Sequence, residues 1–172
     1  MPKVELQSKE NLKTANLLIS LLLRFPEIFS IHLDMPNETF KFTFMLHGKL
    51  AAEEFSHFQK SMRDAFAAYS ELTGKELEIE AGISHFSHLS MLTLLAKTKN
   101  LSLAEIQLCC GLVCNAFPQK VLRDLESLGD IQNEEILQQE EMIDYFLNQG
   151  IRTKKINLLA FRDAGKVFVY NK

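Results

Sequence analysis

Apolar and polar residues alternate most regularly between Thr39 and Leu46, in the segment TFKFTFML. Every second position from Phe40 onward is apolar, and threonine or lysine fills most of the positions between. A period of two places successive side chains on opposite faces of a β-strand. The pattern therefore predicts a strand with one face in a core, and a protein that contains a sheet. It does not indicate an activity.

A second alternating run, FSIHL, precedes this strand at residues 29–33. Turn-forming residues at positions 34–38, DMPNE, join the two runs. We therefore expect residues 28–46 to form an antiparallel β-hairpin.

Apolar residues at helical spacing predict a helix on each side of this hairpin. The first is expected from about Lys9 to Arg24, with Ser8 as its N-cap and Pro26 beyond its end. The second is expected over residues 50–72, before a terminating glycine at position 74. Its apolar stripe consists of Phe55, Phe58, Met62, Ala65, Phe66, Tyr69 and Leu72.

A second strand pair is expected at residues 77–81 and 89–96, with a loop at 84–87. The resulting order α-β-β-α-β-β arises when the first strand of a ferredoxin-like βαββαβ unit is moved to its end. We therefore expect residues 1–100 to form an α+β sheet domain. In this ferredoxin-like permutant, helices lie on one face of a four-stranded antiparallel sheet.

Residues 101–172 are expected to form a helical extension with a C-terminal hairpin, packed on the same core as one domain. Ser102 is a suitable N-cap for its first helix. Pro118 can open a second helix that ends at residue 129, with a short strand over residues 119–125 as the alternative. A further helix is predicted over residues 133–150.

The hairpin is predicted from Ile156 to Tyr170, where Asp163-Ala164-Gly165 suits a type I turn followed by a glycine bulge. Its strands have apolar residues on both faces, so it should extend the sheet or be covered on both sides. An isolated hairpin is barely stable in water, and the helix that ends at Gly150 is its expected docking surface.

The chain, most clearly in its closing segment LLAFRDAGKVFVYNK, resembles a family of uncharacterised proteins from Gram-positive anaerobic bacteria. The resemblance comes with no functional motif, and it implies no site residue or activity.

Composition narrows the class of protein. A hydrophobic content of 47% over 172 residues predicts a packed core rather than a disordered chain. A formal net charge of −3 gives no overall attraction to nucleic acid or to an anionic membrane. The apolar run at residues 17–23 is too short to span a bilayer, and its flanks do not fit a signal peptide. The chain is expected to be cytoplasmic.

Three cysteines, Cys109, Cys110 and Cys114, lie in one predicted helix. An odd number in one short segment indicates reduced thiols rather than a disulfide framework. Cys110 and Cys114 are spaced to share a soft metal, but the chain lacks the second cysteine pair of a zinc site. We interpret the cysteines as packing residues and expect no cofactor.

Three histidines are the candidate metal ligands, because His85 and His88 form an H-x-x-H pair and His47 ends a predicted strand. They would suit the pocket of a small-molecule-binding protein or a metal-dependent enzyme. The chain has no H-E-x-x-H motif, and no spacing places a third ligand. Solvated loop histidines are the favoured interpretation.

Residues 101–131 resemble a helix-turn-helix of the winged-helix kind, through L-S-L-A-E-I and a later L-E-x-L-G. A recognition helix must meet phosphates, yet Lys120 and Arg123 stand against four acids in this segment. A helical hairpin packed on the sheet is favoured, and nucleic-acid binding is the alternative.

Charge is segregated in the last third of the chain. Residues 124–150 contain eight acids and no lysine or arginine, while residues 151–172 contain six bases and one acid. We favour pairing between these segments within the chain. The alternative is that the basic tail is a docking surface for a partner of opposite charge.

The seven glycines are all isolated, so the chain has no glycine-rich nucleotide loop. The leading hypothesis is a non-enzymatic cytosolic interaction or regulatory module, with a homodimer through a sheet edge or helix face. A pocket near His47, His85 and His88 and a nucleic-acid binder using residues 101–131 are the alternatives.

Overall fold

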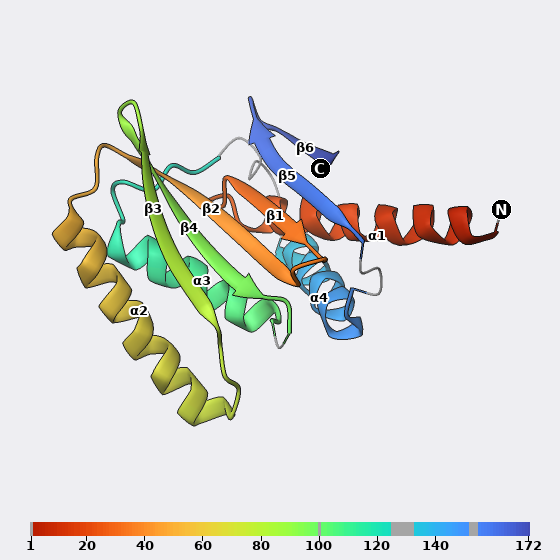
Figure 1. Cartoon of the computed structure of the whole chain (residues 1–172), viewed down its shortest axis with the longest axis horizontal. Helices are drawn as coiled ribbons and strands as arrows, with labels where there is room; N and C mark the ends of the chain where they lie inside the picture. The colour runs from red at the N-terminus through yellow and green to blue at the C-terminus, as the bar shows by residue number, and fades with distance from the viewer. Residues whose placement is uncertain (1, 100, 125–132, 152–154) are drawn as a thin grey trace.

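A computed structural model describes residues 2–99, 101–124, 133–151 and 155–172. Within these ranges the chain forms four helices and six strands (Figure 1). In chain order they are α1 (Pro2–Arg24), β1 (Ser30–Asp34), β2 (Thr39–His47), α2 (Ala52–Thr73), β3 (Ile79–Phe86), β4 (Leu89–Lys97), α3 (Leu103–Ala116), α4 (Asn133–Gln149), β5 (Asn157–Asp163) and β6 (Lys166–Asn171).

The six strands form one antiparallel sheet in the order β3-β4-β2-β1-β5-β6. Its first four positions are those of the ferredoxin-like permutant, so the predicted α+β fold is confirmed. The C-terminal hairpin extends this sheet, because β5 pairs with the free side of β1, with Ile31 opposite Ala160. The hairpin therefore docks through β1 rather than on the helix that ends at Gly150, which corrects the expected docking surface.

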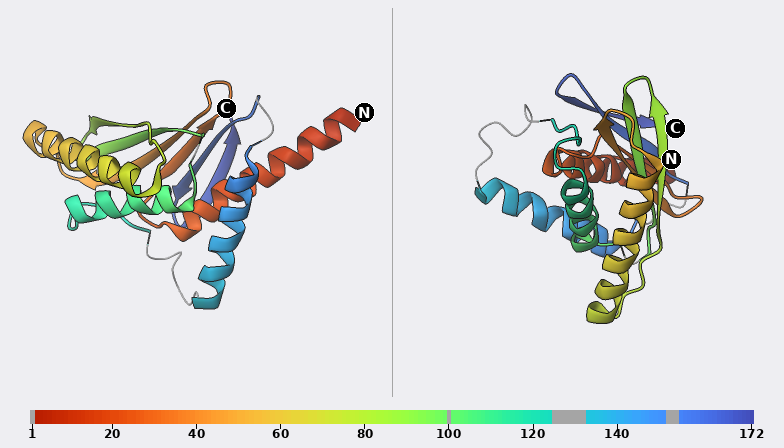
Figure 2. Two further views of the ribbon diagram at one scale, coloured as in Figure 1. Left: turned by 90° about the horizontal axis from the view of Figure 1, so that it is seen from below. Right: turned by 90° about the vertical axis from the view of Figure 1, so that its left-hand side faces the viewer.

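One face of the sheet is buried against the helices. On β2, Phe40, Phe42, Phe44 and Leu46 are buried, as the alternation predicts, and Leu92 and Leu94 on β4 share their face. The helices lie together on this side of the sheet in the edge-on view (Figure 2). Their largest buried contributions are Leu17, Leu18, Leu21, Leu22, Phe58, Met62, Phe66, Ile106, Val113 and Ile143.

Two element boundaries and the length of one buried stripe differ from the sequence prediction. Helix α1 begins at Pro2, so Ser8 lies inside it, and proline suits a first helical position. Strand β3 continues to Phe86, which shortens the predicted loop to two residues. The buried stripe of α2 ends at Phe66, and Leu72 is 86% exposed.

The turn between β5 and β6 is also tighter than predicted. Asp163 pairs directly with Lys166, and both loop residues have positive φ, 50° at Ala164 and 78° at Gly165. These angles belong to a type I′ turn, whose twist matches that of the flanking strands, instead of a type I turn with a bulge.

The helix predicted to start at Pro118 is absent from residues 118–124. This segment instead pairs with the end of β2: the His47 N–H donates to the Lys120 carbonyl at 2.7 Å, and the Leu122 N–H donates to the Met45 carbonyl at 2.9 Å. Strand β1 begins opposite Thr43, so it leaves these β2 groups free. The strand alternative is the better description, and the rest of the predicted helix lies outside the described residues.

Candidate interaction surface

The second face of the sheet, called the open face below, has none of the described helices on it (Figure 2). It is formed by the strand residues that alternate with the buried ones. The pairing registers align these residues in rows across the sheet. One row consists of Gly82, Thr93, Thr43, Ser30, Phe161 and Phe168, and the next consists of Glu80, Leu95, Lys41, His32, Leu159 and Tyr170.

An aromatic cluster occupies the β5–β6 end of the open face. The Phe161 ring stacks on Phe168 at a centroid distance of 5.6 Å and contacts Tyr170 at 5.2 Å. Phe168 is 40% exposed and Tyr170 is 56% exposed. Cross-strand aromatic pairs stabilise a sheet, but these rings leave a large apolar area in water.

Small residues occupy the β3–β4 end of the row that contains Phe161 and Phe168. A Cβ atom at Gly82 would lie 2.9 Å from the Thr93 hydroxyl, so a side chain at this position would have to displace that of Thr93. Larger apolar residues return nearer the β3–β4 turn, where Phe86 is the most exposed, beside Leu89 and Met91. The row from Gly82 to Phe168 therefore has small side chains at the β3–β4 end and large aromatic side chains at the β5–β6 end.

A hollow of about 350 Å³ lies beside the end of β2 that β1 does not reach, because β1 begins opposite Thr43. Its apolar lining includes Phe29, Met45, Leu89 and Leu122, and Arg123 also lines it. Ligand pockets in proteins are about 300–1,000 Å³. The hollow is therefore large enough for one or two side chains of a partner.

Arg162 closes the base of this region from the buried side. It is 7% exposed, and its guanidinium donates to the carbonyls of Leu22, Phe25 and Ile28 while pairing with Asp124 at 3.4 Å. Burial lowers the pKa of Arg162, and the Asp124 carboxylate opposes that shift. Arg162 thus satisfies carbonyls at the end of α1, as cations near helix C-termini do.

The sequence analysis counted Arg162 only as one base of the tail. Its position in the alternation after Leu158 and Ala160, both buried, was the available signal that it points inward. Its pairing with Asp124 links the acidic segment to the basic one within the chain. The described part of the tail, residues 155–172, belongs largely to the sheet.

The three candidate histidines do not converge. His47 lies on the open face beside Leu89, whereas His85 lies on the opposite face, where its Nδ1 is 3.1 Å from the Ser90 hydroxyl. His88 lies in the β3–β4 turn, and its carbonyl accepts a hydrogen bond from Gly48. Among the described residues, no three His, Cys, Asp or Glu side chains are placed to hold a metal.

Cys109 and Cys110 are buried in α3. Burial, with the nearby Glu105 carboxylate, raises the pKa of Cys109 to about 12, and burial also raises the pKa of Cys110. Both thiols therefore stay protonated and unreactive at neutral pH, as packing residues do. Cys114 is partly exposed and lies beside Arg123.

The helix-turn-helix interpretation loses its second helix over residues 118–124. Its first helix, α3, places Ile106, Cys109, Cys110 and Val113 in the core. Ser102 and Glu105 form a capping box at its start, and Lys75 pairs with the buried Glu105 at 3.0 Å. These contacts fix α3 on the molecule.

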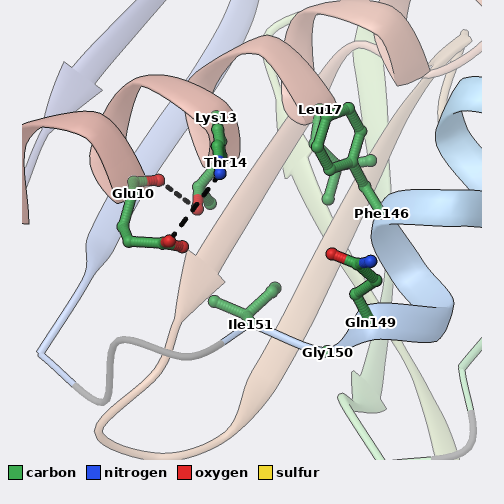
Figure 3. A pocket seen from close by; sticks show the side chains of 8 residues that line it. All are labelled: Glu10, Lys13, Thr14, Leu17, Phe146, Gln149, Gly150 and Ile151. Carbon is green, nitrogen blue, oxygen red and sulfur yellow. Dashed lines mark hydrogen bonds and ion pairs between the residues drawn. The ribbon is translucent and has the colours of Figure 1, made fainter. Parts of the chain in front are cut away.

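A smaller hollow of about 60 Å³ lies between α1 and the end of α4 (Figure 3). Leu17 and Phe146 line it, and the polar groups on α1 already have partners. The Thr14 hydroxyl donates to the Glu10 carbonyl at 2.8 Å, and Lys13 lies 3.9 Å from the Glu10 carboxylate. This hollow is too small for a ligand.

No helix among the described residues is both long enough and apolar enough to cross a membrane. Comparison with protein-family models, curated proteins and solved structures finds no match to this chain. The geometry of the open face therefore carries the functional argument.

Proposed function

We propose that this chain is a protein-interaction module that acts as a homodimer, in which the open faces of two copies pack against each other. The observation that carries the proposal is a sheet whose described helices all lie on one side. Its other side presents Phe86, Leu95, Phe168 and Tyr170 to solvent. Phe161, Phe168 and Tyr170 contact one another and form an exposed apolar patch, and such patches mark interaction sites in soluble proteins.

The open face has the size that a stable dimer needs. Six strands spaced about 4.8 Å apart and about 20 Å long span roughly 29 by 20 Å. Specific interfaces bury about 800 Å² on each partner, which is the same size class. Face-to-face packing of two sheets about 10 Å apart is a common way to bury such a surface.

A second copy suits this face better than a strongly charged partner. Its charged positions balance, with four acids and four lysines distributed over the rows and their ends. They are Asp34, Glu78, Glu80 and Asp163, and Lys41, Lys97, Lys166 and Lys172. A balanced surface gives no steering toward nucleic acid, an anionic membrane or an acidic peptide.

Sedimentation equilibrium of the purified chain tests the proposal. We expect a dimer at concentrations up to about 100 µM, which covers weak specific association. Phe168→Glu and Tyr170→Glu should each shift the protein to monomer while its far-ultraviolet circular dichroism spectrum is retained. The matched control is Leu72→Glu, an exposed apolar position on α2 outside the open face, which should stay dimeric. A wild-type monomer at every concentration would refute the proposal.

A further inference from the structure

We infer that the two copies meet about a two-fold axis parallel to the strands, so that β3 of each copy lies over β6 of the other. This inference rests on the proposed homodimer. A two-fold axis makes the same surface serve both copies. If the axis is parallel to the strands, the strands of the second copy lie in reverse order over those of the first, and each row lies over the same row. If the axis is perpendicular to the strands and in the plane of the sheet, each strand lies over the same strand of the partner, and the order of the rows is reversed.

The heights of the side chains favour the parallel axis. In the row that runs from Gly82 to Phe168, the side chains are small at the β3–β4 end and large at the β5–β6 end. With the parallel axis, Phe161 and Phe168 of one copy lie over Thr93 and Gly82 of the other. With the perpendicular axis, the β5–β6 end with its aromatic cluster lies over the β5–β6 end of the partner, and the end that contains Gly82 and Thr93 lies over its own copy, which packs less closely. Close packing at protein density requires the first arrangement.

The charges at the two edges favour the same axis independently. The β3 edge, residues 76–86, contains Glu76, Glu78 and Glu80 and no lysine or arginine, although Lys97 on β4 lies beside it. The β6 edge, residues 166–172, contains Lys166 and Lys172 and no acid. The parallel axis places the acidic edge of one copy over the basic edge of the other on both sides of the dimer, whereas the perpendicular axis places each edge over the same edge of the partner.

The complementarity is between edges rather than between single residues. Packed sheets cross at about 30°, which displaces positions at the edge of this sheet by roughly 7 Å, or two residues. Either lysine of the β6 edge can therefore face the glutamates of the β3 edge.

A charge-swap experiment tests the axis. The acid variant is Glu78→Lys with Glu80→Lys, and the base variant is Lys166→Glu with Lys172→Glu. Each variant alone places like charges at both edges, so its dimer Kd should rise at least about tenfold at low salt. An equimolar mixture, and the chain with all four changes, restore acid over base and should return the Kd to near the wild-type value.

The control is Glu53→Lys with Glu71→Lys, two exposed positions on α2 that give the same change in net charge as the acid variant. Its Kd should be unchanged. A wild-type dimer whose Kd does not respond to either swap, or whose variants are not restored by mixing, would overturn the axis and leave the homodimer standing. A monomeric wild type would overturn both.

Discussion

The Arg162 side chain donates from Nε to the Ile28 carbonyl at 2.8 Å, which joins β5 to the segment between α1 and β1. The two residues are far apart in sequence, and the contact is buried. It holds the end of the first helix, the start of the first strand and the added hairpin in one arrangement. The open face depends on this junction, because the hairpin supplies the aromatic cluster.

Arg162→Ala should therefore lower the free energy of unfolding by on the order of 3 kcal/mol. The change leaves three buried carbonyls without this donor, and it removes the ion pair between Arg162 and Asp124. Urea denaturation followed by circular dichroism measures the effect. Lys60→Ala, an exposed change on α2 outside the open face, is the matched control and should shift the value by less than about 0.5 kcal/mol. Equal effects of the two changes would contradict the buried role of Arg162.

Phe42→Ala should cost on the order of 3 kcal/mol through the cavity that it leaves. Phe42 is 2% exposed, and its ring stacks on Phe40 at 5.7 Å within the core. Lys41→Ala, at the neighbouring position on the open face, is the control. A denaturation midpoint that is the same for Phe42→Ala and wild type would show that the strand has been assigned to the wrong face.

Much of the fold follows from local patterns in the sequence. The strand at residues 39–47 is predictable because burial on one face imposes a period of two, and its phenylalanines satisfy that period without exception. The helix over residues 52–73 is predictable because Phe58, Met62 and Phe66 repeat at helical spacing before a glycine with φ of 75°. The order of the first four strands then follows from the short connections of a known topology.

The other parts of the fold depend on which strand edge is free to pair with each segment in three dimensions. Residues 119–124 contain both helical and extended signals, and the free backbone groups of Met45 and His47 decide in favour of pairing. The pairing of β5 with β1 places the aromatic cluster beside the first hairpin, and no local period specifies that neighbour. The open face is a consequence of this long-range pairing, so the sequence predicted its apolar residues without predicting that they remain uncovered.

The stabilisation that the buried Glu105 carboxylate provides should be lost in acid. Burial acts to raise its pKa, but hydrogen bonds from Ser102 and Lys75 outweigh burial, so the folded pKa lies below the ordinary value of 4.5. A lowered carboxyl pKa stabilises the fold above the ordinary pKa, and that stabilisation disappears as the pH falls through the folded value. Glu105→Gln should therefore have a flatter stability profile below about pH 4.5, measured by urea denaturation.

The control for this pH effect is Glu53→Gln, an exposed acid in the first turn of α2. Its profile should follow that of the wild type. Parallel acid limbs for Glu105→Gln and wild type would mean that the buried carboxylate does not contribute to the pH dependence.

The three thiols should differ in reactivity. Cys109 and Cys110 are buried and have raised pKa values, whereas Cys114 is partly exposed. Alkylation of the native protein with iodoacetamide at neutral pH should modify Cys114 first, because the thiolate is the reacting form. Mass spectrometry of proteolytic peptides identifies the modified residue. All three should react in denaturant, and rapid native labelling of Cys109 would show that α3 is not packed as described.

Deleting residues 151–172 should abolish cooperative unfolding. The deletion removes Leu158 and Ala160 from the core and exposes the backbone edge of β1, which is otherwise paired along its full length. It also removes Arg162 and so frees the carbonyls at the end of α1.

An edge of this kind promotes aggregation, and loss of core packing gives a compact state without fixed tertiary structure. The truncated chain should therefore be insoluble, or should bind a hydrophobic dye without a near-ultraviolet circular dichroism signal. Deleting only residues 166–172 is the milder comparison, because β5 and its contacts with β1 are kept. A soluble 150-residue product that unfolds cooperatively would show that the hairpin is an accessory to the core, and the junction at Arg162 would then not be needed for folding.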